Sequence, residues 1–286
     1  MTDTLTIDGH RLVMQPLNPA SSGSPVVLIH GATLSTSFFI PPLVPLFAGE
    51  RPAYALSLPG HHPAAFPPDF ADEQFTASSM TDLLAAALEV VFGAEPVSVM
   101  GHSTGGSMAV ALAARHPDRI RDAVSVAGFA RGVTTGTTRL TQRMAAGPPL
   151  TRALFRTTYD LIRQSPRRVY RVWQTTAADP RAYSANPHTG ELAQAIHAGM
   201  QGLDLHALAI VFRRLAAFDI TDWLPQTRVP LLVIAGSADP VVPPEQSRLI
   251  AERVPGAQLA VMQGIGHLPF IEDPTAFNQI LTDWRA

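Results

Sequence analysis

The chain has 286 residues, 46% of them hydrophobic and 15% charged, and this composition excludes disorder and predicts one domain or one domain with an insertion. The formal net charge of −2 excludes a general attraction to nucleic acid and favours a small-molecule substrate. Cysteine and lysine are both absent, which excludes disulfides, a thiolate nucleophile and lysine Schiff-base chemistry.

The first residues lack the basic start and apolar stretch of a signal peptide, and no apolar run approaches the roughly 18 residues that a membrane span requires. We therefore expect a soluble, cytoplasmic protein without a membrane span. A homo-oligomer is compatible with the sequence, which does not determine the oligomeric state.

Short apolar runs alternate with longer helical patterns in the first part of the chain, as in a mostly parallel sheet with helices on both faces. The pattern begins with a hairpin of residues 5–7 and 11–14, turned at Asp8 and Gly9. It continues with strands at 26–29, 53–56, 97–100 and 123–127 and helices at 78–92 and 105–115.

The strand pattern stops between residues 129 and 223, where three amphipathic stretches indicate helices at 150–162, 169–173 and 205–216. We predict a helical cap at 129–223 on an α/β core made of residues 1–128 and 224–286. Residues 131–222 hold 12 arginines against 6 acidic residues. This excess is typical of a solvated helix surface, and it would also steer anionic substrates or meet a partner.

The strand pattern returns at 231–235 and 258–262, with helices at 245–253 and from residue 274 to the end. The prediction is a sheet of about eight strands, with the cap inserted after the sixth.

The pentapeptide Gly101–Gly105 has the form G-x-S-x-G and lies between a predicted strand and a predicted helix. A serine on such a tight turn projects its hydroxyl into open space, and the helix after it directs free N–H groups toward the same place. Ser103 is therefore the candidate nucleophile.

A serine hydroxyl needs a base, and the base needs an orienting carboxylate. Asp239 follows the strand at 231–235, at the end of a parallel strand where functional side chains gather. His267 lies on a glycine-containing loop after the last strand.

The order Ser103, Asp239, His267, each after a strand, resembles that of the α/β-hydrolase superfamily. The resemblance extends over the whole chain, because residues 27–32 look like the family's oxyanion loop and residues 236–243 like its acid loop. Residues 115–120 resemble the usual exit from the elbow helix.

The resemblance implies that Ser103 attacks a carbonyl, that His267 moves the proton, and that Asp239 fixes the tautomer of His267. The backbone N–H groups of Thr104 and Ala32 would bind the oxyanion, with Thr33 as the alternative second donor. For substrate binding we select Thr33, Phe38 and His102.

We expect no cofactor and no metal, because the other histidines lack the paired spacing of a zinc site. The best-supported activity is hydrolysis of a carboxylic ester or lactone of a small to medium, largely apolar substrate. A carbon–carbon bond hydrolase, a thioesterase and a perhydrolase remain alternatives on the same three residues. A non-catalytic ligand receptor on this fold is the alternative outside enzymes.

Overall fold

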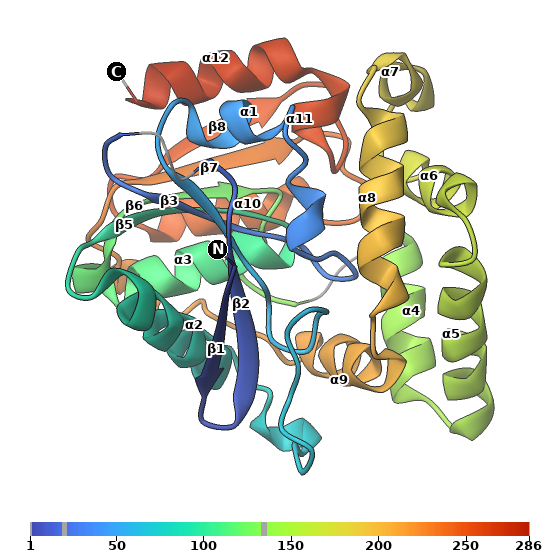
Figure 1. The fold of residues 1–286 in the computed structure, drawn as a ribbon. Helices are drawn as coiled ribbons and strands as arrows, with labels where there is room; N and C mark the ends of the chain where they lie inside the picture. The colour runs from blue at the N-terminus through green and yellow to red at the C-terminus, as the bar shows by residue number, and fades with distance from the viewer. Residues whose placement is uncertain (1, 19–21, 133–135, 286) are drawn as a thin grey trace.

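A computed structural model describes residues 2–18, 22–132 and 136–285, and its centre is one eight-stranded sheet (Figure 1). The spatial order is β1-β2-β4-β3-β5-β6-β7-β8; β1 and β2 are antiparallel to their neighbours and the other strands are parallel. The strands are β1 Asp3–Ile7, β2 His10–Pro16, β3 Val26–Ile29, β4 Ala53–Leu56, β5 Val97–His102, β6 Ile120–Val126, β7 Leu231–Gly236 and β8 Gln258–Met262. The predicted fold class is confirmed.

The opening hairpin turns at Asp8 and Gly9, as predicted. Both residues have positive φ, 48° and 78°, as a two-residue hairpin turn requires. Asp and Gly tolerate this region better than most residues, so the local sequence sets the register in which Ile7 pairs with His10.

Two helical layers cover the sheet, and an apolar cluster lies under each. The first face carries α2 Ala77–Phe92, α3 Thr104–Arg115 and α10 Pro244–Arg253. The opposite face carries α1 Val44–Ala48, α11 Pro269–Glu272 and α12 Pro274–Arg285. Because both faces are covered, the central strands β3, β5 and β7 are buried along their whole length, which explains their continuous apolar runs.

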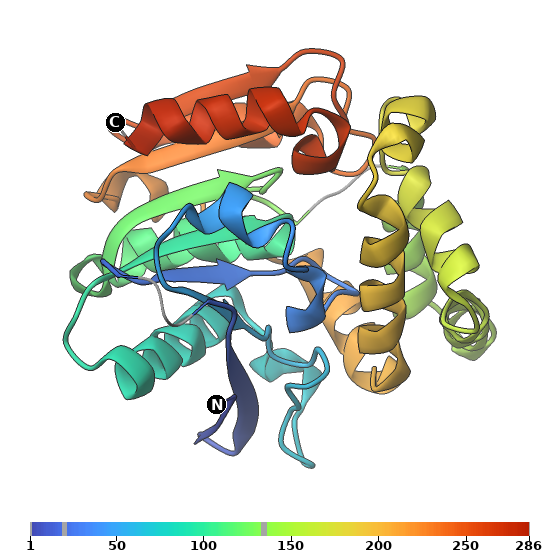
Figure 2. The ribbon, with the colours of Figure 1, turned by 45° about the horizontal axis from the view of Figure 1, so that its top comes forward.

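Among the described residues, six α-helices lie between β6 and β7 in the chain, and in Figure 2 they stand beside the sheet, apart from the helices that cover its faces. They are α4 Gly136–Ala146, α5 Pro149–Ile162, α6 Pro166–Gln174, α7 Pro180–Ala185, α8 Thr189–Gln201 and α9 Leu205–Leu215. We call these helices the cap. Sequence analysis located α5, α6 and α9 and missed the other three as separate helices.

Most element boundaries agree with the predicted ones to within three residues. The helix α2 is capped by Thr76, whose side chain accepts from Ser79 N–H, and it ends at Gly93, with φ of 62°. Short 3₁₀ turns lie at Thr36–Phe38, Asp72–Gln74, Pro117–Arg119 and Leu224–Gln226.

Within the described ranges, no single helix is long and apolar enough to cross a membrane. The bent pair α8 and α9 passes that test of length and composition only when its two helices are taken together.

Candidate active site

Ser103 occupies a strained turn between β5 and α3, with φ of 56° and ψ of −120°. The residues two before and two after it, Gly101 and Gly105, must be glycine because the strand and the helix approach so closely here. A Cβ on Gly101 would lie 2.0 Å from the Gly105 carbonyl oxygen, and a Cβ on Gly105 would lie 2.1 Å from the Ile29 carbonyl oxygen. The close packing of β3, β5 and α3 thus holds the serine in its unusual conformation.

The first residue of α3 is Thr104, and the helix directs its N-terminal end at the space beside Ser103. The Ser103 N–H is already used, because it donates to the Val126 carbonyl at 2.8 Å. Within the described part of the chain, the backbone N–H groups of Thr104 and Ala32 have no hydrogen-bond partner. They are therefore available to a ligand oxygen.

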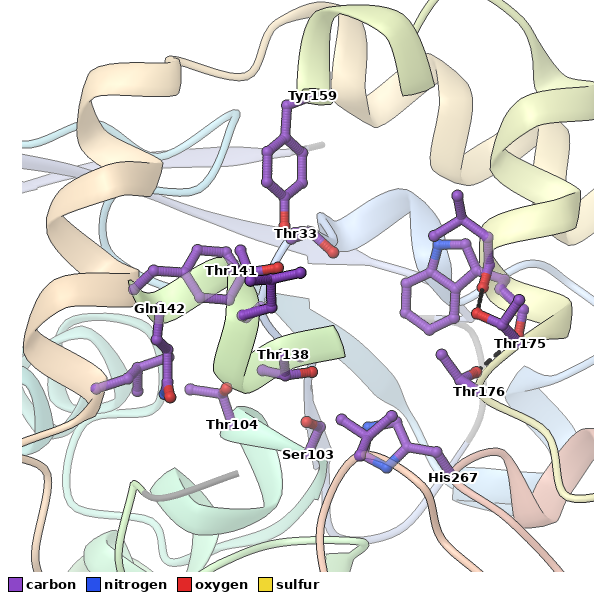
Figure 3. A pocket seen from close by; sticks show the side chains of 18 of the residues that line it. Thr33, Ser103, Thr104, Thr138, Thr141, Gln142, Tyr159, Thr175, Thr176 and His267 are labelled. Carbon is purple, nitrogen blue, oxygen red and sulfur yellow. Dashed lines mark hydrogen bonds between the residues drawn. The ribbon is translucent and has the colours of Figure 1, made fainter. Parts of the chain in front are cut away.

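His267 and Asp239 form a buried pair, in which the His267 Nδ1 lies 2.7 Å from the Asp239 Oδ2. The other carboxylate oxygen accepts from the N–H groups of Val241 and Val242, at 2.7 and 2.9 Å. A carboxylate oxygen can only accept, so Nδ1 of His267 carries the proton. The Nε2 atom is then the basic nitrogen, and Figure 3 shows the imidazole beside the Ser103 hydroxyl.

The backbone of His267 is held from both sides. Its N–H donates to the Thr176 carbonyl at 3.0 Å, and its carbonyl accepts from the Nε2 of His102 at 2.9 Å. Because His102 Nε2 donates, its Nδ1 is unprotonated, and this buried atom has no partner among the described residues. Burial, followed by the charge of His267, lowers the pKa of His102 well below its ordinary value.

The loop that carries Ala32 is fixed by His30. The His30 Nδ1 donates to the Gly31 carbonyl at 2.8 Å, while its Nε2 accepts from the Leu58 N–H at 3.1 Å. Burial and the neighbouring His61 lower the pKa of His30 to about 3, so the ring stays neutral and keeps this pattern of one donor and one acceptor. The orientation of the Ala32 N–H thus depends on a second loop, the one after β4.

A cavity of about 550 Å³ lies over Ser103 and His267, beneath the cap (Figure 3). Cap helices contribute apolar walls, namely Leu140, Met144, Ile162, Val172, Trp173 and Met200. They also contribute polar groups, namely Thr138, Thr141, Gln142, Thr158 and Tyr159, and Thr175 directly after α6 adds another. The Tyr159 hydroxyl bonds the Thr141 side chain, and burial raises the pKa of Tyr159. Among the described lining residues, Arg171 is the one with a permanent charge.

The structure brings most of the selected residues together. Ser103, His267, Thr104, Ala32, Thr33 and His102 all line this cavity, and Asp239 lies directly behind His267. Phe38 does not line it. This side chain is fully buried and stacks on the ring of His102, with ring centroids 5.7 Å apart.

Sequence reasoning did not select the cap residues that close the cavity, such as Tyr159 and Trp173, nor the buried Glu272 near His267. Tyr159 and Trp173 resemble ordinary core residues at helical spacing, so no local pattern distinguishes them. Glu272 follows His267 by five residues, a spacing that has no chemical meaning until the loop is folded.

Among the described residues, no group of three or more histidine, aspartate or glutamate side chains could hold a metal ion.

Comparison with known proteins gives the family. The model of the Alpha/beta hydrolase family matches residues 26–280, and the chain belongs to this family. A relative from Neisseria meningitidis serogroup A, "Pimeloyl-[acyl-carrier protein] methyl ester esterase", is 30% identical over 262 residues, which is 91% of this chain and 76% of that protein.

Solved structures show the same fold. An enol-lactonase from Burkholderia xenovorans superposes with a TM-score of 0.76 at 20% identity, with 99% of both chains covered. A meta-cleavage product hydrolase from Pseudomonas fluorescens gives a TM-score of 0.72 at 19% identity, covering 99% of this chain and 97% of that one.

Proposed function

We propose that the protein is a serine hydrolase that cleaves a carboxylic ester or lactone of a small to medium, largely apolar substrate through an acyl-enzyme. The observation that carries this proposal is the meeting of three loops in one cavity. Ser103 on its strained turn lines the same cavity as His267, and His267 is paired with Asp239. The related esterase from Neisseria supports ester chemistry, since its name describes cleavage of a methyl ester.

The geometry supports the following steps. His267 Nε2 takes the proton of the Ser103 hydroxyl as the serine oxygen attacks the ester carbonyl. The N–H groups of Thr104 and Ala32 stabilise the resulting oxyanion, each contributing about 3 kcal/mol by mutational precedent. The protonated His267 then gives its proton to the leaving alkoxide, which leaves an acyl group on Ser103.

Water completes the cycle. His267 takes a proton from a water molecule whose oxygen attacks the acyl group, and then returns that proton to the Ser103 oxygen as the acid departs. Asp239 stabilises the charged imidazole in both halves of the reaction.

The apolar cap walls favour an apolar chain next to the reacting carbonyl, and the cavity volume of about 550 Å³ favours a substrate of medium size. In this proposal residues 129–223 form the cap and residues 1–128 and 224–286 the core. No cofactor or metal takes part. The cytoplasmic location and the homo-oligomer stay predictions.

The test is the variant Ser103→Ala with p-nitrophenyl butyrate as substrate. We expect kcat to fall about a thousandfold or more, with the thermal unfolding midpoint little changed. A fluorophosphonate should label wild type once, on Ser103, and should not label the variant. Ser184→Ala, an exposed serine on α7, is the matched control and should keep the full rate.

Equal turnover by Ser103→Ala and wild type would exclude the mechanism. The alternative activities use the same three side chains, so substitutions alone do not separate them. A panel of esters, lactones, thioesters and diketones does, because each activity acts on a different substrate. The outcome that excludes ester hydrolysis is labelling of Ser103 together with turnover of a diketone only.

A further inference from the structure

Glu272 ends α11 and is a buried acidic residue without an opposite charge beside it. The residue is 9% exposed, and none of the ion pairs among the described residues includes it. Burying a carboxylate without a cation is costly unless hydrogen bonds satisfy its oxygens. Such a group needs a specific explanation.

Glu272 accepts hydrogen bonds from both residues that flank His267. Its Oε1 accepts from the N–H of Gly266 at 3.1 Å and from the N–H of Leu268 at 3.3 Å. The carboxylate therefore fixes the chain immediately before and immediately after the catalytic imidazole.

The second oxygen of Glu272 reaches the cap. It accepts from the Ala178 N–H at 2.8 Å, in the link between α6 and α7, and also from Gly266 at 3.1 Å. The approach is close, because a Cβ on Gly266 would lie 2.4 Å from the Ala178 nitrogen. One carboxylate thus joins the histidine loop to the cap.

A second hydrogen bond also joins the histidine loop to the cap. The His267 N–H donates to the carbonyl of Thr176, two residues before Ala178, and Thr176 also lines the cavity (Figure 3). Cap residues 176–178 are therefore joined to the histidine loop twice, once directly at the backbone of His267 and once through the side chain of Glu272. Burial raises the pKa of Glu272, and the hydrogen bonds from backbone N–H groups oppose that rise. All the neighbours that bond Glu272 are donors, so the group acts only as an acceptor.

We propose that Glu272 is a positioning residue: by joining the loop of His267 to cap residues 176–178, it sets the angle at which the imidazole faces Ser103. This inference rests on the proposed function, in which His267 is the base. Glu272 itself touches neither the substrate nor the reacting atoms.

The main test is the pair Glu272→Gln and Glu272→Asp. Glutamine places an NH₂ group where one oxygen accepts, and aspartate is too short to reach the loop and the cap together. A displacement of about 1 Å at a reacting group costs roughly a hundredfold in rate. We expect kcat per fluorophosphonate-titrated site to fall tenfold to a hundredfold, and KM for p-nitrophenyl butyrate to change less than twofold.

The matched control is Glu191→Gln, an exposed glutamate on cap helix α8. It should keep the wild-type kcat. A purely structural Glu272 would lower the number of titrated sites or the unfolding temperature and leave kcat per site unchanged, and that result would overturn the proposal.

A readout without substrate separates this inference from the proposed function. The short bond between His267 and Asp239 should give a low-field imidazole proton in the ¹H NMR spectrum, assigned by its loss in His267→Gln. We expect Glu272→Gln to shift or broaden this signal and Glu191→Gln to leave it in place. An unchanged signal in Glu272→Gln counts against the proposal even if Ser103→Ala proves to be fully active.

If neither Glu272 variant folds, Ala178→Pro tests the same link from its exposed side. Proline removes the N–H that donates to Glu272 and puts its Cδ in the place of that hydrogen, so this bond between the carboxylate and the cap is broken while Glu272 itself is unchanged. A loss of kcat per site and a shifted low-field proton support the proposal. Wild-type values for both measurements overturn it.

Discussion

Buried histidines impose a pH dependence on stability that is separate from catalysis. His30 lies wholly inside the protein, and its pKa is lowered to about 3 by burial and by His61. The unfolded chain exposes the same ring to water, where its pKa is about 6.5. Between these values the unfolded state binds more protons than the folded one, so the free energy of unfolding falls as the pH falls from 6.5 toward 3.

The expected size follows from the same values. For His30 alone, lowering the pH from 7 to 5 should cost about 2 kcal/mol of the free energy of unfolding. Urea denaturation of wild type and His30→Gln at both pH values measures the free energy of unfolding. On acidification, the free energy of unfolding of the variant should fall by about that amount less than that of wild type. His206→Gln, an exposed histidine on α9, is the control. An equal pH effect in wild type and His30→Gln would contradict the assignment.

The candidate residues were selected from local sequence because each follows a strand within a compact motif. Ser103 has glycines at both sides of a strand-to-helix turn, and Asp239 and His267 lie in loops after parallel strands. Glu272 was not selected because its meaning comes from contacts with Gly266 and Ala178, and Ala178 is 94 residues away in the chain. Phe38 is close to the oxyanion loop in the sequence, yet it does not line the cavity and its ring stacks on His102.

At the scale of elements, the close approach of α3 to β3 and β5 fixes the turn that carries Ser103. Gly105→Ala would put a Cβ 2.1 Å from the Ile29 carbonyl oxygen, and backbone cannot easily give way. We expect at least about 2 kcal/mol of lost stability, and a loss of fluorophosphonate labelling in the folded protein. The control is Gly190→Ala in α8, where a Cβ meets no atom within 4 Å and the backbone is helical.

The two measurements for each variant are the thermal unfolding midpoint and the rate of fluorophosphonate labelling. Gly190→Ala should match wild type or exceed it slightly, because alanine favours a helix. Wild-type stability and labelling in Gly105→Ala would mean that the elbow accommodates a side chain, against the close packing described above.

The sheet was predictable as a whole because buried parallel strands and amphipathic helices have different periods in the sequence. The cap was harder. The helix α7 has only six residues, and α4 carries few apolar side chains. In α8 the buried side chains Leu192, Ile196 and Met200 are spaced four apart among glycine, histidine and glutamine, which weakens the helical pattern.

At the scale of the whole molecule, charge is divided unevenly. Residues 131–222 hold 12 arginines and 6 acidic residues, whereas the rest of the chain holds 9 arginines and 17 acidic residues. Arg171 belongs to the positive part and lines the cavity, and no ion pair among the described residues includes it. A substrate in the cavity therefore lies near a positive charge that no ion pair among the described residues neutralises.

We expect this field to favour esters that carry a remote carboxylate. Their kcat/KM should fall about threefold or more as NaCl rises from roughly 10 to 300 mM, because salt screens the attraction. A neutral ester of equal length should change little. Arg171→Gln should reduce the salt effect, and Arg181→Gln, an exposed arginine of α7 outside the cavity, should reduce it less. Equal salt curves for both esters would exclude steering.

The cap is inserted between β6 and β7, and the three candidate catalytic residues all lie outside it. This arrangement suggests a module that a different helical insertion could replace. The bonds from Thr176 and Ala178 to the histidine loop limit that freedom. Any foreign cap grafted between β6 and β7 must supply a carbonyl and an N–H at those two places. Both bonds are made by backbone atoms, so exchanging the side chains that line the cavity leaves this attachment of the cap in place.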